Sequence, residues 1–190
     1  MNQEHLRICS SPEWASFVET ELLPWALGDR DLGDEVLEIG PGPGLTTDVL
    51  RRRVARLTAV EIDDALAHAL CARLAGSNVD VVHANGTELP IAAGRFSAAT
   101  VFTMLHHLPS VALQDQLFSE LRRVLRPEAV LVGTDSLETA SRRELHAGDI
   151  YTPVDPSTLK GRLTAVGFVD VIIDEIEDRF RFIASVPATS

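Results

Sequence analysis

The sequence predicts an α/β fold in which a mainly parallel sheet, with one antiparallel strand, is covered by helices on both faces. Two patterns lead to this prediction. Short apolar runs rich in β-branched residues alternate with amphipathic helical patterns, which is typical of parallel sheets. The last two apolar runs, residues 169–174 and 180–186, are separated only by residues 175–178, and this indicates a hairpin that adds the antiparallel strand.

The first half of the chain shows a local signal for each element. Ser11 followed by Pro12 is typical of a helix start, and apolar residues then recur at helical spacing as far as Pro24. Asp64 is the expected cap of a later helix. After the linker 28–34, the expected elements are a strand at 36–39, a helix at 45–53, a strand at 58–61 and a helix at 64–75.

The second half continues the alternation. Further strands are expected at 79–82, 98–103 and 130–134, the loop 83–94 follows the first of these, and a helix is expected at 111–125. Residues 136–156 show no regular pattern. A helix at 157–166 ends at Gly167, because glycine suits the left-handed conformation of a C-terminal cap.

The most informative segment is the strand, turn and helix from Val36 to Arg53. Gly40, Gly42 and Gly44 follow the strand at alternate positions, so the backbone there can approach a ligand closely. The next strand ends in Glu61, and a carboxylate at this place is the usual partner of a ribose hydroxyl pair. Together the two signals predict a cofactor that contains adenosine.

The spacing of the glycines narrows the choice of cofactor. Leu45 stands where the nicotinamide fingerprint G-x-G-x-x-G needs its third glycine, and no phosphate-binding lysine is near. Glu38 lies just before the first glycine, and no basic residue lies between Glu35 and Leu50. A carboxylate there would repel a pyrophosphate, but it would attract the ammonium and sulfonium groups of an aminoacyl cofactor.

These motifs resemble the class I S-adenosylmethionine-dependent methyltransferases of small-molecule type. The resemblance covers about residues 34–135 and extends in order through E-I-G-P-G-P-G (38–44), V-E-I-D (60–63), N-G-T-E-L-P (85–90), F-S-A-A-T-V (96–101), L-H-H-L (105–108) and L-R-R-V-L-R-P (121–127). It implies a Rossmann-like sheet of seven strands in the order 3-2-1-4-5-7-6. It also implies an enzyme whose cofactor is S-adenosylmethionine.

The length favours one methyltransferase domain, residues 1–190, with three parts. Residues 1–33 are expected to form an N-terminal helix and lid, residues 34–135 the cofactor-binding core, and residues 136–190 the substrate-side segment and closing hairpin. The fraction of hydrophobic residues, 45%, is enough for a full core.

The resemblance also implies a set of cofactor-binding residues. Gly40 and Gly42 would let the backbone pass under the methionine part, Glu38 would lie near the ammonium, and Glu61 would hold the ribose hydroxyls. Asn85 and Gly86 stand where the family usually has an acidic residue beside the adenine amino group, whose hydrogen the asparagine oxygen can accept. The other residues expected at the cofactor are Pro41, Gly44, Thr46, Ile62 and Thr103.

The candidate catalytic residues follow the fourth and fifth strands. His106 and His107 adjoin the position that faces the methyl donor, and a histidine is the natural base for a hydroxyl acceptor near neutral pH. The alternative is that these histidines only pack. Asp135 and His146 are further candidates, and the four residues could gather a divalent ion such as Mg²⁺. Their spacing matches no metal motif, so no metal is expected.

The expected function is O-methylation of a hydroxyl on a small metabolite, such as a sugar, phenol, polyketide or lipid precursor. C- or N-methylation of a small molecule remains an alternative, as does a non-catalytic partner subunit that binds the cofactor. The glycine segment also resembles the ribosomal RNA adenine dimethylases. Their Asn-x-Pro-Tyr motif is replaced here by T-M-L-H-H-L-P-S (103–110), which lacks the aromatic that stacks on the base.

The charge and composition limit the partners and the compartment. A formal net charge of −11 argues against a nucleic-acid substrate and against binding to anionic membranes. The chain contains no leader-like segment and no apolar run of about 18 residues. Cys9 and Cys71 are far apart and suggest no disulfide framework, so we expect a cytoplasmic protein. A homodimer could supply a roof for the substrate.

Overall fold

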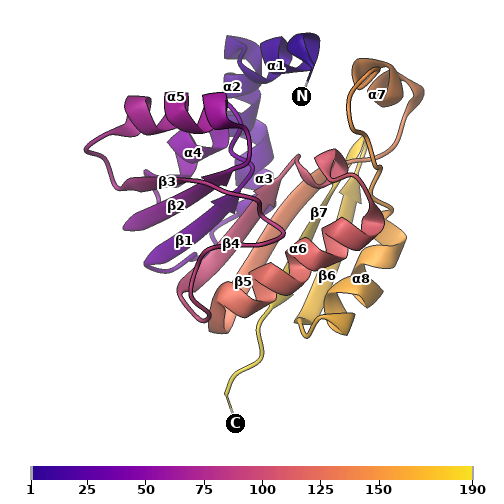
Figure 1. Cartoon of the computed structure of the whole chain (residues 1–190). Helices are drawn as coiled ribbons and strands as arrows, with labels where there is room; N and C mark the ends of the chain where they lie inside the picture. The colour runs from indigo at the N-terminus through magenta and orange to yellow at the C-terminus, as the bar shows by residue number, and fades with distance from the viewer. Residues whose placement is uncertain (1, 190) are drawn as a thin grey trace.

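The computed structural model describes residues 2–189 and shows a seven-stranded sheet in the order β3-β2-β1-β4-β5-β7-β6 (Figure 1). This confirms the predicted fold class and strand order. The strands are β1 Glu35–Ile39, β2 Arg56–Glu61, β3 Val79–His83, β4 Phe96–Phe102, β5 Leu125–Ser136, β6 Val169–Ile176 and β7 Arg179–Ser185.

The one antiparallel strand is β7. It pairs antiparallel with β5 on one side and with β6 on the other, whereas β1 to β5 pair parallel with one another. A tight turn at Glu177 and Asp178 connects β6 to β7, and the carbonyl of Asp178 accepts a hydrogen bond from the Leu137 amide at 2.8 Å. The predicted closing hairpin is therefore confirmed.

Helices cover both faces of the sheet because neighbouring strand residues point in opposite directions. Leu37 joins a core with α6 (Val111–Val124) and α8 (Pro156–Ala165). Val36, its neighbour in β1, belongs to a second core with α3 (Leu23–Leu27) and α4 (Leu45–Leu50). Helix α5 (Asp64–Leu74) packs on Ala59 of β2 through Leu70 and Leu74.

The N-terminal region contains more helix than the sequence suggests. Ser11 caps α2 (Pro12–Phe17), as predicted, by accepting a hydrogen bond from the Trp14 amide at 3.1 Å. The helix then widens into the π-helical turn η1 (Val18–Leu22) and continues as α3, so Pro24 does not end it. A π-turn leaves room for a proline ring that an unbroken α-helix would exclude. An additional helix, α1 (Gln3–Cys9), comes before these elements.

Three local predictions were wrong in detail. Asp63, not Asp64, caps α5 by accepting a hydrogen bond from the Leu66 amide. Strand β5 begins at Leu125 rather than at residue 130. The segment predicted to be irregular contains α7 (Ala140–Leu145), whose six residues are too few to show a helical period.

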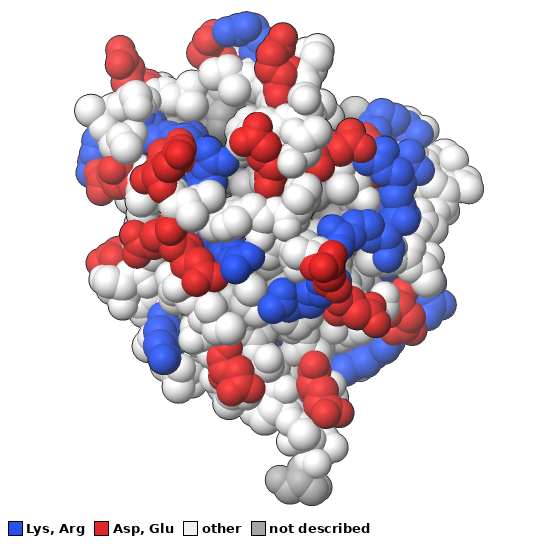
Figure 2. Space-filling view, turned by 180° about the vertical axis from the view of Figure 1, so that it is seen from behind, with Lys and Arg blue, Asp and Glu red and all other residues white. Residues whose placement is uncertain are grey.

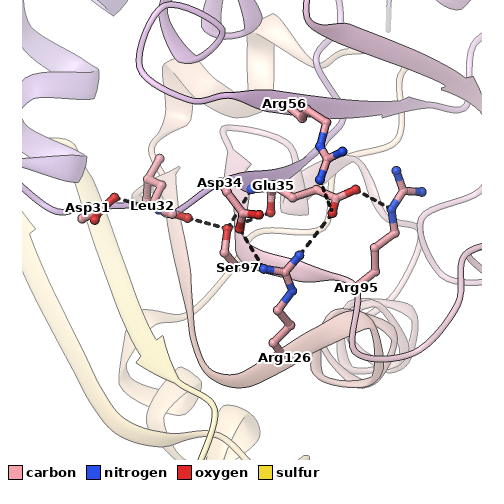
Figure 3. A network of polar contacts seen from close by, with 9 residues as sticks. Asp31, Leu32, Asp34, Glu35, Arg56, Arg95, Ser97 and Arg126 are labelled. Atoms are coloured by element: carbon pink, nitrogen blue, oxygen red, sulfur yellow. Dashed lines mark hydrogen bonds and ion pairs between the residues drawn. The ribbon is translucent and has the colours of Figure 1, made fainter.

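A network of ion pairs closes the edge of the sheet where β1 begins (Figure 3). The Glu35 carboxylate, whose side chain is 11% exposed, contacts Arg95 at 2.8 Å, Arg126 at 3.2 Å and Arg56 at 3.5 Å. Arg126 also contacts Asp34 at 2.7 Å. The network joins the starts of β1, β2, β4 and β5, at the edge opposite the glycine turn, so it serves stability.

The surface carries acidic and basic groups that are mingled over the face shown in Figure 2. Many of the arginines in the described chain are engaged with carboxylates, including Arg51 and Arg73, which both contact Asp48. Between residues 2 and 189, no helix has the length and apolar character needed to cross a bilayer.

Candidate functional site

A cavity of 510 Å³ opens at the edge where β1, β2 and β4 end. Its wall includes the glycine turn, the residues that follow β2, β3 and β4, and a roof from the N-terminal helices and residues 149–150. The predicted site residues that line it are Gly40, Pro41, Gly42, Thr46, Glu61, Ile62, Asn85, Gly86, Thr103 and His107. Five predicted residues do not line it: Glu38, Gly44, His106, Asp135 and His146.

The glycine turn brings bare backbone to the wall of the cavity. Gly40, Gly42 and Gly44 have φ values of 68°, 54° and 88°, in the left-handed region that favours glycine. A Cβ atom on Gly40 would come within 3.0 Å of the Met104 side chain, and one on Gly44 would come within 2.4 Å of Leu70. Gly44 therefore shapes the turn and caps α4 rather than facing the cavity.

The Glu61 carboxylate is fixed at the cavity wall by two backbone amides. Oε2 accepts a hydrogen bond from the Gly42 amide at 2.9 Å, and Oε1 accepts one from the Asp63 amide at 2.9 Å. Glu61 is only 6% exposed, so its geometry is set before any ligand arrives. Each oxygen retains a further lone pair, and two such acceptors side by side match the two hydroxyls of a ribose.

Glu38 lies behind the cavity wall. Its carboxylate is 1% exposed and accepts hydrogen bonds from the hydroxyls of Thr46 and, at 2.7 Å, Thr47. Burial raises the pKa of Glu38 to about 7, against the lowering effect of the two threonine hydrogen bonds. Thr46 does line the cavity, so any influence of Glu38 on a ligand passes through Thr46.

Asn85 and Gly86 form the wall after β3. Asn85 Oδ1 already accepts hydrogen bonds from the Thr87 amide and hydroxyl, both at 3.0 Å. The sequence predicted only that this oxygen would accept a hydrogen bond from the adenine amino group. A Cβ atom on Gly86 would come within 3.0 Å of Ile39. Glycine at this position therefore lets the backbone pack against β1.

Thr103 holds a strained backbone conformation directly after β4. Its φ of 51° lies in the left-handed region, which a β-branched residue rarely adopts. Its amide donates to the carbonyl of Thr134 at 2.8 Å, and this bond fixes the turn. Strain of this kind is concentrated at functional sites, and here it carries the chain into η2 (Leu105–His107).

His106, in the middle of η2, is paired with Asp135 at the end of β5. His106 Nδ1 lies 2.6 Å from Asp135 Oδ1, and the His106 amide donates to Oδ2 at 3.2 Å. Burial acts to raise the pKa of Asp135, but the charge and hydrogen bond of His106 outweigh it and lower that pKa. Asp135 is 1% exposed and does not line the cavity, so its role there is to hold the His106 imidazole in place.

Four histidines gather beside the cavity. His107 and His5 line it, and His106 and His146 lie against them, with ring centroids 4.2–6.3 Å apart among the four. Burial lowers the pKa of His107 to about 3 and that of His5 to about 4. Sequence reasoning missed His5, since nothing in its neighbourhood distinguishes it from a histidine on any amphipathic helix.

Comparison with known proteins gives the family. A family model described as a methyltransferase domain matches residues 37–133, which is more than half of the chain. The chain belongs to the S-adenosylmethionine-dependent methyltransferases. A probable S-adenosylmethionine-dependent methyltransferase of Mycolicibacterium smegmatis is 33% identical over 126 residues, which are 66% of this chain and 47% of that protein.

Two further comparisons show the range of relatives of this methyltransferase. A ribosomal RNA small subunit methyltransferase A of Deinococcus radiodurans is 43% identical over 61 residues, 32% of this chain and 21% of that protein. The N-methyltransferase NodS of Bradyrhizobium japonicum, solved with S-adenosylhomocysteine, shares the fold with a TM-score of 0.72 and 20% identity over 98% and 93% of the two chains. The aligned region spans less than half the length of the curated relatives.

The geometry of this methyltransferase fits its cofactor, S-adenosylmethionine. A side chain at Gly40 would press on Met104 and one at Gly86 would press on Ile39, so bare backbone lines the cavity at these two places. The fixed carboxylate of Glu61 offers two acceptors toward a diol. Ile62, an exposed apolar residue at 65% exposure, adds a flat apolar surface beside that carboxylate.

Proposed function

We propose that this methyltransferase transfers a methyl group from S-adenosylmethionine to a hydroxyl of a small metabolite. The observation that supports this best is that one cavity of 510 Å³ is lined by the glycine turn, by His107 and by the roof residues Trp14 and Ile150. A cofactor and a small acceptor can share such a space. A folded RNA would need an open basic surface instead.

In this proposal each cofactor contact belongs to a residue on the cavity wall. Glu61 binds the ribose hydroxyls, while Ile62, Asn85 and Gly86 lie at the adenine. Because Asn85 Oδ1 already has two donors, the adenine is held by shape and by backbone groups more than by that oxygen. The methionine part is held by Gly40, Pro41 and Gly42 of the glycine turn together with Thr46 and Thr103.

The ammonium of the cofactor explains why a carboxylate is buried at Glu38. An ammonium near Thr46 would favour the charged form of Glu38, which burial otherwise disfavours. The cofactor supplies a methyl group on a positively charged sulfur, which is already activated for transfer. The chain therefore contributes mainly by positioning the acceptor, exclusion of water and control of the acceptor's proton.

The acceptor meets the roof of the cavity, where His5, His107 and Asp149 provide polar groups. A hydroxyl can donate a hydrogen bond to the neutral His107 imidazole and so be oriented toward the methyl group. An imidazole whose pKa is about 3 is a weak proton acceptor, however, because general bases work best when their pKa lies near the working pH. The histidines alone thus account for orientation better than for deprotonation.

Methylation of ribosomal RNA is the second candidate, because relatives such as the Deinococcus radiodurans protein carry that name. The mixed charges on the face shown in Figure 2 and the net charge of −11 favour the small acceptor. Filter binding of ribosomal RNA at low ionic strength separates the two. Sub-micromolar binding with a steep dependence on salt would favour RNA.

The compartment and assembly are part of the same proposal. We assign the protein to the cytoplasm, and we propose a homodimer through the edge strand β6. This strand exposes Val169, Ile172 and Ile176 at 39%, 49% and 41%. Light scattering on the purified protein tests the dimer, and Ile172→Lys is expected to shift a dimer toward monomer.

The decisive test of the reaction is a panel of small hydroxyl, amine and carbon acceptors incubated with the protein and S-adenosylmethionine. We expect S-adenosylhomocysteine to form only with some hydroxyl compounds, together with an equal amount of a methyl ether. Formation of N-methyl or C-methyl products would reassign the acceptor atom. Tight cofactor binding without turnover of any acceptor would support the non-catalytic subunit.

A further inference from the structure

Three buried imidazole nitrogens of the described chain have no hydrogen-bond partner, and all three belong to histidines of one close group. In the part of the chain that the structure describes, the buried side-chain atoms without a partner include His5 Nδ1, His106 Nε2 and His146 Nε2. One nitrogen from each of these residues and from His107 lies within 4.8 Å of all the others. Buried polar groups are normally paired, so a converging set without partners suggests a missing ligand.

The opposite nitrogens of two of these histidines are already fixed. His106 Nδ1 is bound to Asp135 Oδ1 at 2.6 Å, and His146 Nδ1 is bound to the carbonyl of Arg142 at 2.7 Å. A proton on each Nδ1 leaves the lone pair of each Nε2 free to bind a ligand. Carboxylates and backbone carbonyls orient metal-bound histidines in this way.

We propose that His5, His106, His107 and His146 bind one divalent transition-metal ion of the zinc class. With metal–nitrogen bonds of ~2.0–2.1 Å, four imidazoles around one ion have ring centroids about 5 Å apart. The observed centroid separations of 4.2–6.3 Å bracket this value, so small ring rotations complete the site.

The sequence led us to expect no metal, and the four residues considered there for Mg²⁺ included Asp135 in place of His5. Imidazole nitrogens suit zinc, copper, nickel and iron, whereas magnesium prefers oxygen. Asp135 acts as the partner of His106 and not as a ligand, and its place in the set is taken by His5 from α1. The site thus unites residues that are far apart in the sequence.

The ion would fasten the roof of the cavity. His5 lies on α1, His106 and His107 lie on η2, and His146 follows α7. Figure 1 shows α1 and α7 above the same edge of the sheet. Asn2 already links two of these segments, through its amide to Asp149 at 2.7 Å and its side chain to the carbonyl of Leu145 at 2.8 Å. A shared ion would add a second and stronger link.

The position of the ion also gives it a chemical role, which rests on the proposed function. His5 and His107 line the cavity, so an acceptor hydroxyl can approach the ion from that side and bind it as a fifth ligand. Metal binding lowers the pKa of a bound hydroxyl, whose proton then passes to water. The oxygen–methyl bond forms as the sulfur–methyl bond breaks, and a methyl ether and S-adenosylhomocysteine result.

The binding test uses a background that removes the chain's other histidines. His68 and His83 both approach Asp64 Oδ1, at 3.2 and 3.4 Å, and could hold a surface ion. The full chain carrying His68→Ala and His83→Ala, purified without a polyhistidine tag, is therefore titrated with Co²⁺. We expect one equivalent to bind with the visible spectrum of a low-coordinate cobalt–imidazole site, and Zn²⁺ to displace it. Mg²⁺ is expected to have no effect.

Thermal unfolding gives a second readout that does not depend on turnover. Zn²⁺ at a free concentration one hundred times its Kd is expected to raise Tm by about 5–10 °C. In the same background, His5→Gln and His146→Gln are each expected to weaken Zn²⁺ binding by more than about 100-fold, and Asp135→Asn by about 10–100-fold. Circular dichroism confirms that each variant is folded.

Failure of the background protein to bind Co²⁺ or Zn²⁺ at micromolar concentrations would overturn the metal site. So would equal binding in the background and in the folded His5→Gln protein. Neither result would touch the proposed methyl transfer, which the acceptor panel tests. Metal binding without turnover of any acceptor would uphold the site but contradict both its chemical role and the proposed methyl transfer.

Discussion

The strongest single prediction concerns Glu61. Its two oxygens are held by the amides of Gly42 and Asp63, both at 2.9 Å, so the carboxylate is already in place for a ribose. The variant Glu61→Gln keeps the shape of the side chain but removes the charge and turns one acceptor into a donor. A charge-assisted contact of this kind contributes about 1.5–3 kcal/mol, which corresponds to a loss of about 10–150-fold in affinity for S-adenosylmethionine.

Titration calorimetry measures this effect directly. The matched control is Glu88→Gln, which alters an exposed carboxylate beside the same edge that does not line the cavity and is expected to bind normally. Unfolding experiments on both variants separate a loss of affinity from a loss of structure at the glycine turn. Unchanged affinity in a folded Glu61→Gln protein would remove Glu61 from the cofactor site, and tighter binding of NAD would refute the assignment of the cofactor.

Three further predictions concern stability and are tested by urea unfolding. Burial raises the pKa of Glu38 in the folded protein from 4.5 to about 7, so the stability of the wild type falls as pH rises from 4.5 to about 7. Glu38→Gln should remove this fall, so at pH 8 the variant should gain up to about 3 kcal/mol of stability relative to the wild type. Glu35→Gln should cost about 2–3 kcal/mol because three arginines lose their shared carboxylate, whereas Glu19→Gln, in an exposed pair with Arg52, should change stability by less than about 0.5 kcal/mol. Glu128→Gly should stabilise the protein by about 0.5–1 kcal/mol because Glu128 has a φ of 63°, and a loss of stability there would contradict the argument from strain.

The overall topology follows from local patterns. Alternating strand and helix signals, together with the family resemblance, gave the strand order, and the strand–glycine–helix unit identified the edge where the cavity lies. Glu61 could be recognised because its place depends only on the end of β2 and the preceding glycine turn. Short-range relations of this kind can be predicted directly from the order of the residues in the sequence.

The relations that were missed depend on contacts between distant segments. His5 meets His146 where Asn2 links α1 to the end of α7, across more than 140 positions of sequence. Asp135 contacts His106 and does not line the cavity, because the end of β5 lies next to η2 in the folded chain. The burial of Glu38 beneath Thr46 and Thr47 likewise depends on how α4 leaves the glycine turn. Packing in three dimensions decides each of these.

The central claim is that the cavity transfers methyl groups from S-adenosylmethionine to a small metabolite. The most direct measurement offers the wild-type protein methyl-labelled S-adenosylmethionine together with a metabolite extract and ribosomal RNA in one reaction. The account predicts that label appears in the low-mass fraction, at an equal amount to S-adenosylhomocysteine, and that Glu61→Gln reduces it. Label recovered in the RNA, with none in the small molecules, would contradict the account.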